Sequence, residues 1–285
     1  MTSWKKNFKY YFLILLAAGT FFIWYAVFIE SKSILTVAFL DVGQGDAIFI
    51  EAPGGNQILI DGGKNSSVLS ELSKVMPFYD RTIDLIIATH PDADHIGGLP
   101  EVLNNYEVRA VMESGNLSES AFYKELEKMT KKEGAVRLSA QKGQRISLGG
   151  GVYLDILFPA GDAGKMESNT SSIVAKLVYG GNSFLFTGDS PRVVENYLAS
   201  VYKDNLDVDV LKVGHHGSDT SSSEMFTGYV SPAYAIISAG KDNSYGHPHK
   251  ETIDTLNKFG AKILATYELG TIIFESDGEK MKIKK

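Results

Sequence analysis

Cysteine is absent from all 285 residues of the sequence. The chain therefore forms no disulfide bond, and thiolate metal sites and cysteine nucleophiles are excluded. An excess of basic residues is absent as well, because residues 34–285 hold 24 Lys and Arg against 33 Asp and Glu, a formal net charge of −9. A protein that coats nucleic acid carries a broad basic surface. The charge balance thus argues against a DNA-coating protein, although it does not exclude an enzyme that cuts DNA.

Long apolar runs are scarce, and the one of membrane-spanning length lies near the N-terminus. Tyr11 to Ile29 carries no charged residue. At a rise of about 1.5 Å per residue, a run of this length covers roughly the 30 Å of a bilayer core. Lys5, Lys6 and Lys9 precede it, and basic flanks tend to stay in the cytoplasm. We therefore expect a basic cytoplasmic stub over residues 1–10, a transmembrane anchor over residues 11–29 and an extracytoplasmic domain over residues 34–285.

A cleaved signal peptide is the alternative interpretation of the same run. The apolar part of a signal peptide is usually shorter and ends in small residues at the cleavage site. Here the run ends in the bulky segment Trp24-Tyr25-Ala26-Val27-Phe28-Ile29. This ending favours an anchor that is retained.

From Ile34 onward, short apolar runs alternate with amphipathic segments. By periodicity and turn signals we expect strands and helices in alternation, with tight Gly turns between the early strands. The expected strands are Ile34–Leu40, Asp46–Glu51, Gln57–Ile60, Leu85–Ala88, Val108–Met112, Val152–Phe158, Ile173–Tyr179, Ser183–Thr187, Val208–Val213, Ala233–Ser238, Lys262–Ala265 and Thr271–Glu275. The expected helices are Ser66–Val75, Leu99–Asn104, Ser118–Glu133, Pro191–Ser200, Ser222–Gly228 and Pro248–Phe259. This order predicts an α+β fold of two packed mixed sheets with helices outside.

The densest polar cluster follows the apolar run Leu85–Ala88, in the stretch His90-Pro91-Asp92-Ala93-Asp94-His95. Imidazole and carboxylate ligands together suit zinc, manganese or iron. His90 and Asp92 are two residues apart in an extended stretch, so their side chains point the same way and are placed to share an ion. Asp94 and His95 follow the turn and are placed to serve a second ion.

The other four histidines lie in two further short loops, as His215-His216 and His247-Pro248-His249. Histidines without a common role would scatter, whereas ligands from separate loops converge in metal sites. Asp61, Asp189 and the pair His215-His216 each follow an expected strand, so they can meet at one edge of the fold. We interpret these clusters as parts of a single site, in which Asp189 bridges two ions.

Together these motifs resemble those of the metallo-β-lactamase superfamily. The residues that carry the resemblance are His90-x-Asp92-x-Asp94-His95, Asp61-Gly62-Gly63, Gly188-Asp189 and a late His216. Within the superfamily, three segments resemble the extracytoplasmic domain of the ComEC family of DNA-uptake proteins: Phe39–Ala47, Leu211–Ser218 and Asn243–Pro248. The resemblance covers nearly all of residues 34–285.

The resemblance implies a four-layer αββα sandwich that binds two divalent metal ions, Mn²⁺ or Zn²⁺. The implied metal ligands are His90, Asp92, Asp94, His95, Asp189 and His216. We expect Asp94 to orient the attacking water, His247 to protonate or hydrogen-bond the leaving group, and His215 to contact the substrate. The reverse assignment of His215 and His216 stays open, and a turn histidine beside Pro248 is the alternative for His247. Supporting or substrate-contacting roles are expected for Asp41, Asp46, Asp61, Asn169 and Lys212, and Lys212 and Lys241 are local lysines placed to hold a phosphate.

The sequence departs from the commoner superfamily pattern at two places. Asp92 stands where many members have histidine, and no histidine lies between His95 and His215. Asn169 occupies roughly the place of the missing ligand and offers a neutral oxygen. Fewer imidazoles and more oxygens favour manganese or another harder ion over zinc. They also predict that the first ion is weakly held.

The expected function is that of a membrane-tethered, extracytoplasmic, metal-dependent phosphodiesterase or nuclease that acts on DNA or another phosphodiester. One span does not form a DNA channel, so a separate uptake channel is the expected partner, and scavenging of extracellular DNA is a related role. A cell-wall phosphodiesterase that acts on phosphorylcholine of teichoic acid is an alternative. A non-catalytic scaffold that has lost its metals is another. β-Lactamase activity is disfavoured, because it is rare outside its own branch of the superfamily.

Overall fold

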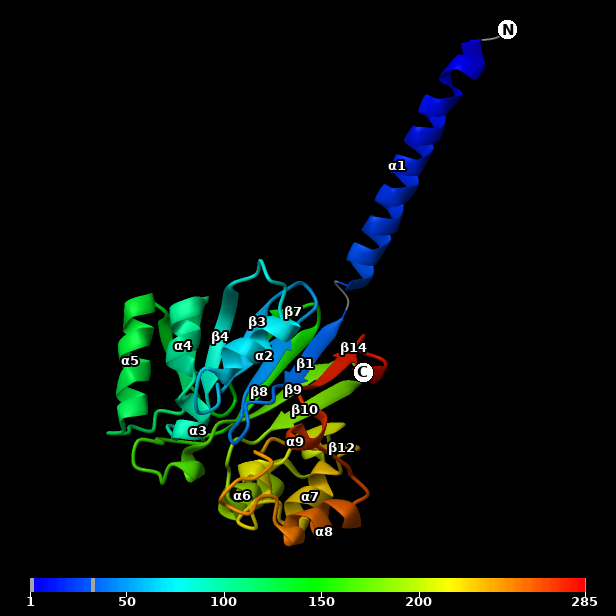
Figure 1. Cartoon of the computed structure of the whole chain (residues 1–285). Coiled ribbons are helices and arrows are strands. Elements are labelled where there is room, and N and C mark those ends of the chain that lie inside the picture. The colour runs from blue at the N-terminus through cyan, green and yellow to red at the C-terminus, as the bar shows by residue number, and fades with distance from the viewer. Residues whose placement is uncertain (1–2, 32–33, 285) are drawn as a thin grey trace.

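Two β-sheets with helices on both outer faces form the domain in the computed structural model, which describes residues 3–31 and 34–284 (Figure 1). The strands are β1 Leu35–Phe39, β2 Ile48–Glu51, β3 Gln57–Ile60, β4 Thr82–Ala88, β5 Glu107–Glu113, β6 Val136–Ser139, β7 Arg145–Gly149, β8 Val152–Phe158, β9 Val174–Tyr179, β10 Asn182–Phe186, β11 Val210–Lys212, β12 Tyr234–Ile237, β13 Lys262–Ala265, β14 Ile272–Ser276 and β15 Met281–Lys284. The α-helices are α1 Ser3–Ser31, α2 Ser67–Val75, α3 Ala93–Ile96, α4 Leu99–Asn105, α5 Ala121–Glu133, α6 Arg192–Tyr202, α7 Glu224–Val230, α8 Lys250–Lys258 and α9 Thr266–Leu269, and short 3₁₀ turns cover η1 Asn169–Ser171, η2 Lys203–Leu206 and η3 Gly214–Gly217.

The sheets are mixed, and in each of them some neighbouring strands run parallel. The first sheet runs β15-β14-β1-β2-β3-β4-β5-β6 and the second runs β13-β12-β11-β10-β9-β8-β7. β3 pairs with β4 in parallel, and so do β10 with β11 and β11 with β12. The carboxyl ends of neighbouring parallel strands meet at one edge of a sheet, so the loops that follow these strands lie together.

The core lies between the two sheets. It includes a cluster of aromatic rings from both sheets, with Phe39 and Phe274 from the first packed against Phe184 and Phe186 from the second. Each fully buried ring of this size stabilises the fold by about 1.5–3 kcal/mol. The apolar runs that indicated strands in the sequence supply these inward faces, because alternate residues of a strand share one face.

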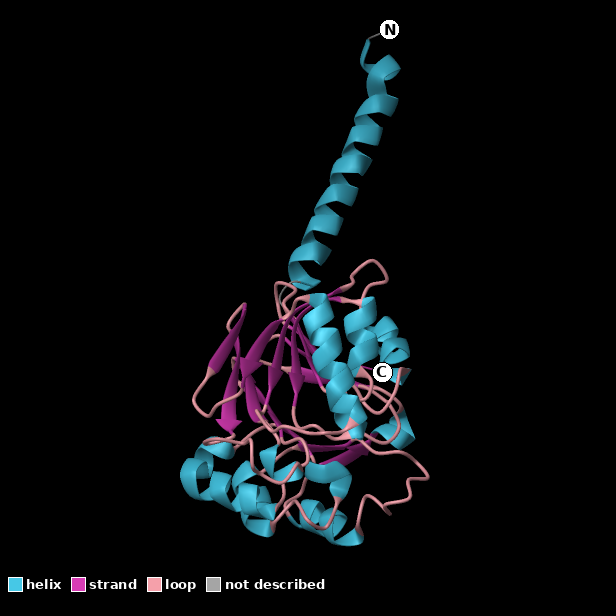
Figure 2. Cartoon of the chain, turned by 90° about the vertical axis from the view of Figure 1, so that its left-hand side faces the viewer, coloured by secondary structure: helices cyan, strands magenta, loops and turns pink. Residues whose placement is uncertain are grey.

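Helices cover the outer face of each sheet. Residues of α2, α4 and α5 pack against the first sheet, and residues of α6, α7 and α8 pack against the second. Figures 1 and 2 show the resulting order of helix layer, sheet, sheet and helix layer. The expected αββα sandwich is therefore confirmed. Every expected strand and helix is present, with ends shifted by up to three residues, and β6, β7 and β15 come in addition.

Helix α1 lies apart from the sandwich in both views (Figures 1 and 2). Its segment Asn7–Tyr25 is long and apolar enough to cross a membrane, and within residues 3–31 and 34–284 it is the one helix that meets this description. It overlaps the expected anchor, Tyr11–Ile29. Length and composition of this kind are also found in signal sequences, so they show an apolar N-terminal helix and no topology.

Candidate metal centre

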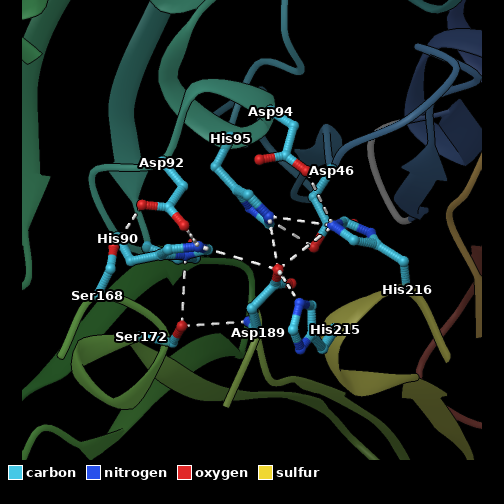
Figure 3. Close-up of polar contacts among 12 residues, drawn as sticks. Asp46, His90, Asp92, Asp94, His95, Ser168, Ser172, Asp189, His215 and His216 are labelled. Atoms are coloured by element: carbon cyan, nitrogen blue, oxygen red, sulfur yellow. Dashed lines mark hydrogen bonds and ion pairs between the residues drawn. The ribbon is translucent and has the colours of Figure 1, made fainter. Parts of the chain in front are cut away.

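Histidines and carboxylates from the loops that follow β4, β10 and β11 come together in one cluster (Figure 3). The loop after β4 holds His90 to His95, and Asp92 caps the short helix α3. Asp189 follows β10, and His215-His216 follow β11 in η3. A chain segment that the sequence analysis treated as part of a strand, Asp46-Ala47, instead stays in the loop before β2 and brings Asp46 to the same cluster.

Three donor atoms lie close enough to hold a single ion and a fourth lies beside one of them, and we call this group of four the four-donor half of the site. His95 Nε2 lies 3.3 Å from His216 Nε2 and 3.3 Å from Asp189 Oδ2. His216 Nε2 lies 3.4 Å from Asp94 Oδ2 and 3.4 Å from Asp189 Oδ2. Ligands about 2.1 Å from one tetrahedral ion lie about 3.4 Å from one another. The spacing of His95, His216 and Asp189 thus fits one bound ion, and Asp94 lies beside this group through its contact with His216.

The outer nitrogens of both imidazoles are already used. Nδ1 of His95 lies 2.7 Å from Asp61 Oδ2, and Nδ1 of His216 lies 2.8 Å from the carbonyl oxygen of Ser238. Both partners accept hydrogen bonds, so Nδ1 is the protonated nitrogen and each Nε2 of a neutral ring presents a lone pair. The two lone pairs face each other, and a cation between them removes the repulsion. This arrangement, in which an outer acceptor orients a ligating histidine, is typical of metal sites.

The electrostatics of the buried pocket also favour a positive charge at this place. Burial opposes protonation of His95 and His216, but Asp189 and the adjacent carboxylates outweigh burial and raise the pKa of both histidines well above its usual value. Conversely, burial would raise the pKa of Asp189, but His216 and His95 hold it well below its ordinary range. Cations and carboxylates therefore stabilise each other here. The residues present fit a divalent ion.

His90, Asp92 and the shared Asp189 form a second group, the three-donor half of the site. His90 Nε2 lies 3.7 Å from Asp92 Oδ2 and 3.9 Å from Asp189 Oδ2, and it is buried without a hydrogen-bond partner among the residues described. Burial, and next the neighbouring His95, lower the pKa of His90 to about 4, so this ring is neutral and offers a lone pair. The donors are more widely spaced than in the four-donor half, and an ion here would need further ligands.

The segment expected to replace the missing histidine reaches the three-donor half through a neighbouring residue. Ser168 Oγ donates to Asp92 Oδ1 at 2.5 Å. The side-chain oxygen of Asn169 is buried and lacks a hydrogen-bond partner among the described residues. Ser172 Oγ lies 3.3 Å from His90 Nδ1 and accepts from the backbone N–H of Asp189 at 3.1 Å. The segment from Ser168 to Ser172 therefore positions ligands of both halves.

The backbone of the site adopts conformations that most residues avoid. Asp61, His215 and His216 have φ of 57°, 48° and 54°. The left-handed region costs roughly 1–2 kcal/mol for such residues, and it persists where surrounding contacts enforce it. Gly45, with φ of 123°, passes so close to the ligand loop that a Cβ would lie 2.0 Å from the Asp94 carbonyl oxygen. Asp46 N–H in turn donates to that oxygen at 3.2 Å. Local strain is thus used to bring these loops together.

Lys212 and Asp46 form a fully buried ion pair beneath the ligands. Lys212 Nζ also lies 3.4 Å from the Gly188 carbonyl oxygen and 4.0 Å from Asp189 Oδ1. The expectation that Lys212 holds a substrate phosphate is wrong, because no part of this side chain is exposed to solvent. Asp46 also has an oxygen within 4.8 Å of the donor atoms of His95, Asp189 and His216, close enough for these four residues to hold an ion. Its oxygens face the Nδ1 sides of both rings, however, at 3.8 Å from His95 and 3.3 Å from His216, so Asp46 supports the ligand rings from behind.

Three further expected residues lie around this centre. His215 is partly exposed, with Nε2 3.7 Å from Asp189 Oδ2 and Nδ1 3.0 Å from Thr220 Oγ1. The His247 ring lies 5.5 Å from the His215 ring, and burial followed by the neighbouring His215 lowers the pKa of His247 to about 4. Asp41 lies in the β1–β2 loop and accepts from Gly43 N–H at 3.3 Å, which is a turn contact.

Sequence reasoning overlooked three groups that orient the ligands: Ser172, the Ser238 carbonyl, and Thr89. Thr89 donates from N–H and Oγ1 to the two oxygens of Asp61, at 2.8 and 2.7 Å, and thereby fixes the carboxylate that holds His95. Thr89 and Ser172 adjoin motifs that the analysis singled out, so proximity to a motif was the available signal. The Ser238 carbonyl carries no sequence signal, since every residue has one.

Comparison with known proteins agrees with this geometry. Residues 40–241 match the metallo-beta-lactamase superfamily. The chain is 34% identical over 254 residues to ComE operon protein 3 of Bacillus subtilis (strain 168), covering 83% of this chain and 32% of that protein. It is 31% identical over 251 residues to competence protein ComA of Neisseria gonorrhoeae, covering 86% of this chain and 32% of that protein. The chain thus spans about a third of the length of these curated relatives.

A solved structure shares the fold. Igni18, a metallo hydrolase from the hyperthermophilic archaeon Ignicoccus hospitalis KIN4/I, superimposes with a TM-score of 0.54 at 14% identity, covering 88% of this chain and 99% of that one. The resemblance to the ComEC family noted in the motifs is confirmed by the curated relatives. Because the superfamily match extends over most of the chain, the protein belongs to the metallo-β-lactamase superfamily and carries a ComEC-like domain of that fold.

Proposed function

We propose that the protein is a membrane-tethered, metal-dependent phosphodiesterase whose substrate is DNA. The observation that supports hydrolysis best is the four-donor half, in which two Nδ1-anchored imidazoles and Asp189 lie 3.3 to 3.4 Å apart and Asp94 lies 3.4 Å from His216. A scaffold without catalytic function has no need of ligand rings that are oriented so completely.

The proposed ligand sets follow the two halves of the site. Asp94, His95 and His216 would hold one ion, His90 and Asp92 the other, and Asp189 would bridge them. Such a pair of ions lowers the pKa of a water molecule and neutralises the oxygens of a phosphodiester. Asp94 Oδ2 lies 3.4 Å from His216 Nε2, and the Asp94 side chain is 25% exposed, so its other oxygen is placed to orient a water molecule. His215, also 25% exposed, faces the same opening and is placed to contact the substrate.

His247 is the proposed partner of the leaving group. Its ring lies 6.4 Å from that of His216, and its buried Nδ1 has no hydrogen-bond partner among the residues described. A neutral ring in this place has an N–H to donate to a departing oxygen, and His247 is not among the residues whose donor atoms lie close enough together to hold an ion. We propose a hydrogen-bonding role for it at the reacting end of the substrate.

The choice of a phosphodiester polymer draws on the openness of the site and on the relatives. Asp92 is 45% exposed, so a ligand of the three-donor half can be reached from solvent. A site at an open edge admits a long chain, whereas a small substrate is usually enclosed. DNA is the proposed polymer because a competence protein is among the relatives and because the motifs resemble those of DNA-uptake proteins. A cell-wall phosphodiester is the second candidate, because it presents the same reacting group.

Hydrolysis can be tested with the full chain in nanodiscs. After treatment with a chelator and dialysis, the protein should cleave bis-p-nitrophenyl phosphate and plasmid DNA when Mn²⁺ is added, and should leave nitrocefin intact. Asp94→Asn removes the carboxylate charge and keeps nearly the same side-chain shape, and this variant should be inactive. Asp41→Asn in the β1–β2 loop is the matched control. Full activity in excess chelator would refute the metal-dependent reaction. Inactivity on both phosphodiesters with every divalent ion would favour the non-catalytic scaffold.

The tether is the second part of the proposal, and it rests on α1 and on the lysines before it. We propose that Tyr11–Ile29 crosses the membrane with residues 34–285 on the outer side, where a separate uptake channel is the proposed partner. Protease added to intact protoplasts should then remove the domain and leave a short stub in the membrane. A domain that is protected until the cells are lysed would reverse the topology, and a domain free in the medium would indicate a cleaved signal peptide.

A further inference from the structure

A turn on the side of the domain opposite the metal centre displays two aromatic side chains to solvent. Pro77 to Asp80 join α2 to β4, and Phe78 and Tyr79 stand at the two central positions. Phe78 is 87% exposed and Tyr79 is 76% exposed, the highest values among the large hydrophobic side chains of residues 34–284. Their rings contact each other edge to face, with centroids 5.4 Å apart. Contiguous apolar patches on a protein surface often mark a site of contact with a protein or a membrane.

The turn is held firmly, so the exposure of this pair is built into the fold. Asp80 N–H donates to the Pro77 carbonyl oxygen at 3.0 Å and closes the turn. The Asp80 carboxylate accepts from Thr82 N–H at 3.0 Å and from Gln57 Nε2 at 2.8 Å. Gly, Asn, Asp and Ser are the usual central residues of a turn, because they adopt its geometry at low cost. Nothing in the turn geometry requires aromatic residues there.

The turn lies at the edge of the first sheet where the chain arrives from α1. β1 is antiparallel to β2, β2 is antiparallel to β3, and β3 is parallel to β4. The starts of β1 and β4 therefore share one edge, and the metal ligands follow the far ends of β3 and β4. In Figure 1 the turn between α2 and β4 rises on the side from which α1 leaves.

The short connection to α1 keeps this edge close to the end of the helix. α1 ends at Ser31 and β1 begins at Leu35. At about 3.3–3.6 Å per residue, the intervening backbone spans at most roughly 14 Å. The aromatic turn is therefore confined to the neighbourhood of whatever surface α1 enters.

We propose that the Phe78-Tyr79 turn docks into the interfacial layer of the bilayer that α1 crosses. This inference rests on the proposed tether. Aromatic rings with an apolar body and, in Tyr79, a polar tip favour the headgroup level of a membrane. Lys74 and Arg81 flank the turn and are exposed, Lys74 in an ion pair with Glu71 and Arg81 in contact with Tyr106, and their positive charges suit an anionic lipid surface. The Asp80 carboxylate, in contrast, is turned back onto Thr82 and Gln57.

Docking at this edge fixes the orientation of the catalytic opening. The seven residues of β4 separate the turn from the ligand loop. At about 3.3 Å per residue, the metal centre stands roughly 23 Å farther from the membrane and faces away from it. A polymer outside the cell then reaches the site without approaching the lipid surface.

The absence of cysteine allows a direct test with a single introduced thiol. Phe78→Cys in the full chain is labelled with bimane and reconstituted into vesicles of phosphatidylethanolamine and phosphatidylglycerol. The phospholipids carry bromine near the carboxyl end of the acyl chain. Val193→Cys on α6 is the matched control, since Val193 is 64% exposed and lies at the edge that holds the site. The bromine should quench about half or more of the emission of the label at position 78. The emission should also shift to the blue, because the interface excludes much of the water.

Flotation of the same vesicles after an alkaline wash separates the two proposals. Protein that floats, with quenching at position 78 and none at position 193, supports docking. Protein that floats with equal emission at both positions refutes docking and leaves the tether intact, and the aromatic pair would then belong to a protein partner. Protein that does not float refutes the tether and the docking together.

A second variant tests whether the aromatic rings themselves cause docking. Phe78→Ser combined with Tyr79→Ser should leave the thermal midpoint unchanged, since both side chains are exposed. A bimane at Lys74→Cys, on the same edge, should be quenched by the brominated lipid in the parent chain and released by the double substitution. Quenching that survives the double substitution would show that the rings are not what holds the edge to the lipid.

Discussion

The two halves of the metal centre differ in how completely the protein has built them. In the four-donor half, facing donors lie 3.3 to 3.4 Å apart and an acceptor holds each imidazole from behind. In the three-donor half, His90 Nε2 lies 3.7 Å from Asp92 and 3.9 Å from Asp189. Fewer and more distant donors preorganise an ion less, since the remaining coordination must come from water or substrate.

This difference suggests that the two halves bind their ions with different affinity. An ion in the four-donor half would stay with the resting protein, and an ion in the three-donor half would bind more weakly and gain ligands from a phosphodiester. The missing histidine between His95 and His215 predicts the same weakly held ion. The geometry adds a reason, because Ser168 occupies an oxygen of Asp92 that would otherwise be free for an ion.

The largest effect is expected from Asp189→Ala, which removes the one carboxylate that both halves share. Asp189 Oδ2 lies within 4 Å of Nε2 of His90, His95, His215 and His216. The variant should lose both ions. Its rate of hydrolysis should fall by more than the roughly 10–100-fold that results from removing a residue that only orients a ligand. Metal analysis after dialysis, together with rates on bis-p-nitrophenyl phosphate, measures both. Retention of one ion would mean that the halves are independent sites.

A second pair of variants separates the halves directly. Asp94→Ala should remove the tightly held ion, whereas Asp92→Ala should leave it in place and lose only the weaker one. Calorimetric titration of metal into the chelator-treated chain should show a tight and a weak binding phase in the parent. Asp94→Ala should keep only the weak phase, and Asp92→Ala should keep only the tight phase. If Asp92→Ala removes the tight phase, the ranking of the halves is reversed.

The next effect concerns catalysis without ligation. His247→Ala should keep the metal content near normal and lower the rate by about 10²-fold or more, the usual value of a positioned proton donor. His249→Ala is the matched control, because its ring lies 5.1 Å from the His247 ring and it pairs with Asp219 at the start of α8. Loss of metal in the His247 variant would make this residue a ligand.

The sequence motifs named side chains that the fold brings together as candidate ligands, but they did not separate the two halves. The motifs named His90 and His95 equally, because sequence spacing does not report distances across loops. The acceptors that distinguish His95, namely Asp61 fixed by Thr89, come from another strand. The place of Lys212 was also beyond reach, since an apolar strand that ends in lysine predicts an exposed tip. Its burial follows from the carboxylate of Asp46, which arrives from the β1–β2 loop.

The same limit explains which strands were missed. β6, β7 and β15 all lie at the edge of a sheet. An edge strand needs fewer apolar residues because one side is open to solvent, and Val136–Ser139 are exposed throughout. Central strands such as β4 are buried on both faces and read as continuous apolar runs. Periodicity therefore predicted the central strands of both sheets and missed three of the four edge strands.

A smaller effect is expected from the outer support of the four-donor half. Asp61→Asn keeps the acceptor for Thr89 N–H, and asparagine tolerates the φ of 57° found here. The group that faces His95 Nδ1 then becomes either an amide NH₂, which does not accept a hydrogen bond, or an amide oxygen, which accepts more weakly than a carboxylate. The affinity of the tight ion should fall by about 10–100-fold. Competition against a chromophoric chelator measures this, with circular dichroism as the check on folding. An unchanged affinity would show that His95 does not depend on Asp61 for its orientation.

The smallest effect concerns the choice of metal, and it sharpens the comparison because only the three-donor half should respond. Asp92 supplies an oxygen where many superfamily members have an imidazole, and oxygen donors suit manganese better than zinc. We expect Mn²⁺ to support a higher rate than Zn²⁺ in the parent chain. Asp92→His should raise the ratio of the zinc rate to the manganese rate by about tenfold or less, since one ligand of several changes. It should leave the tight phase of metal binding unaltered, because Asp92 does not belong to the four-donor half. Zinc activity that already exceeds manganese activity in the parent would overturn the argument from oxygen ligands. A tight phase weakened by Asp92→His would show instead that the two halves are coupled through Asp189.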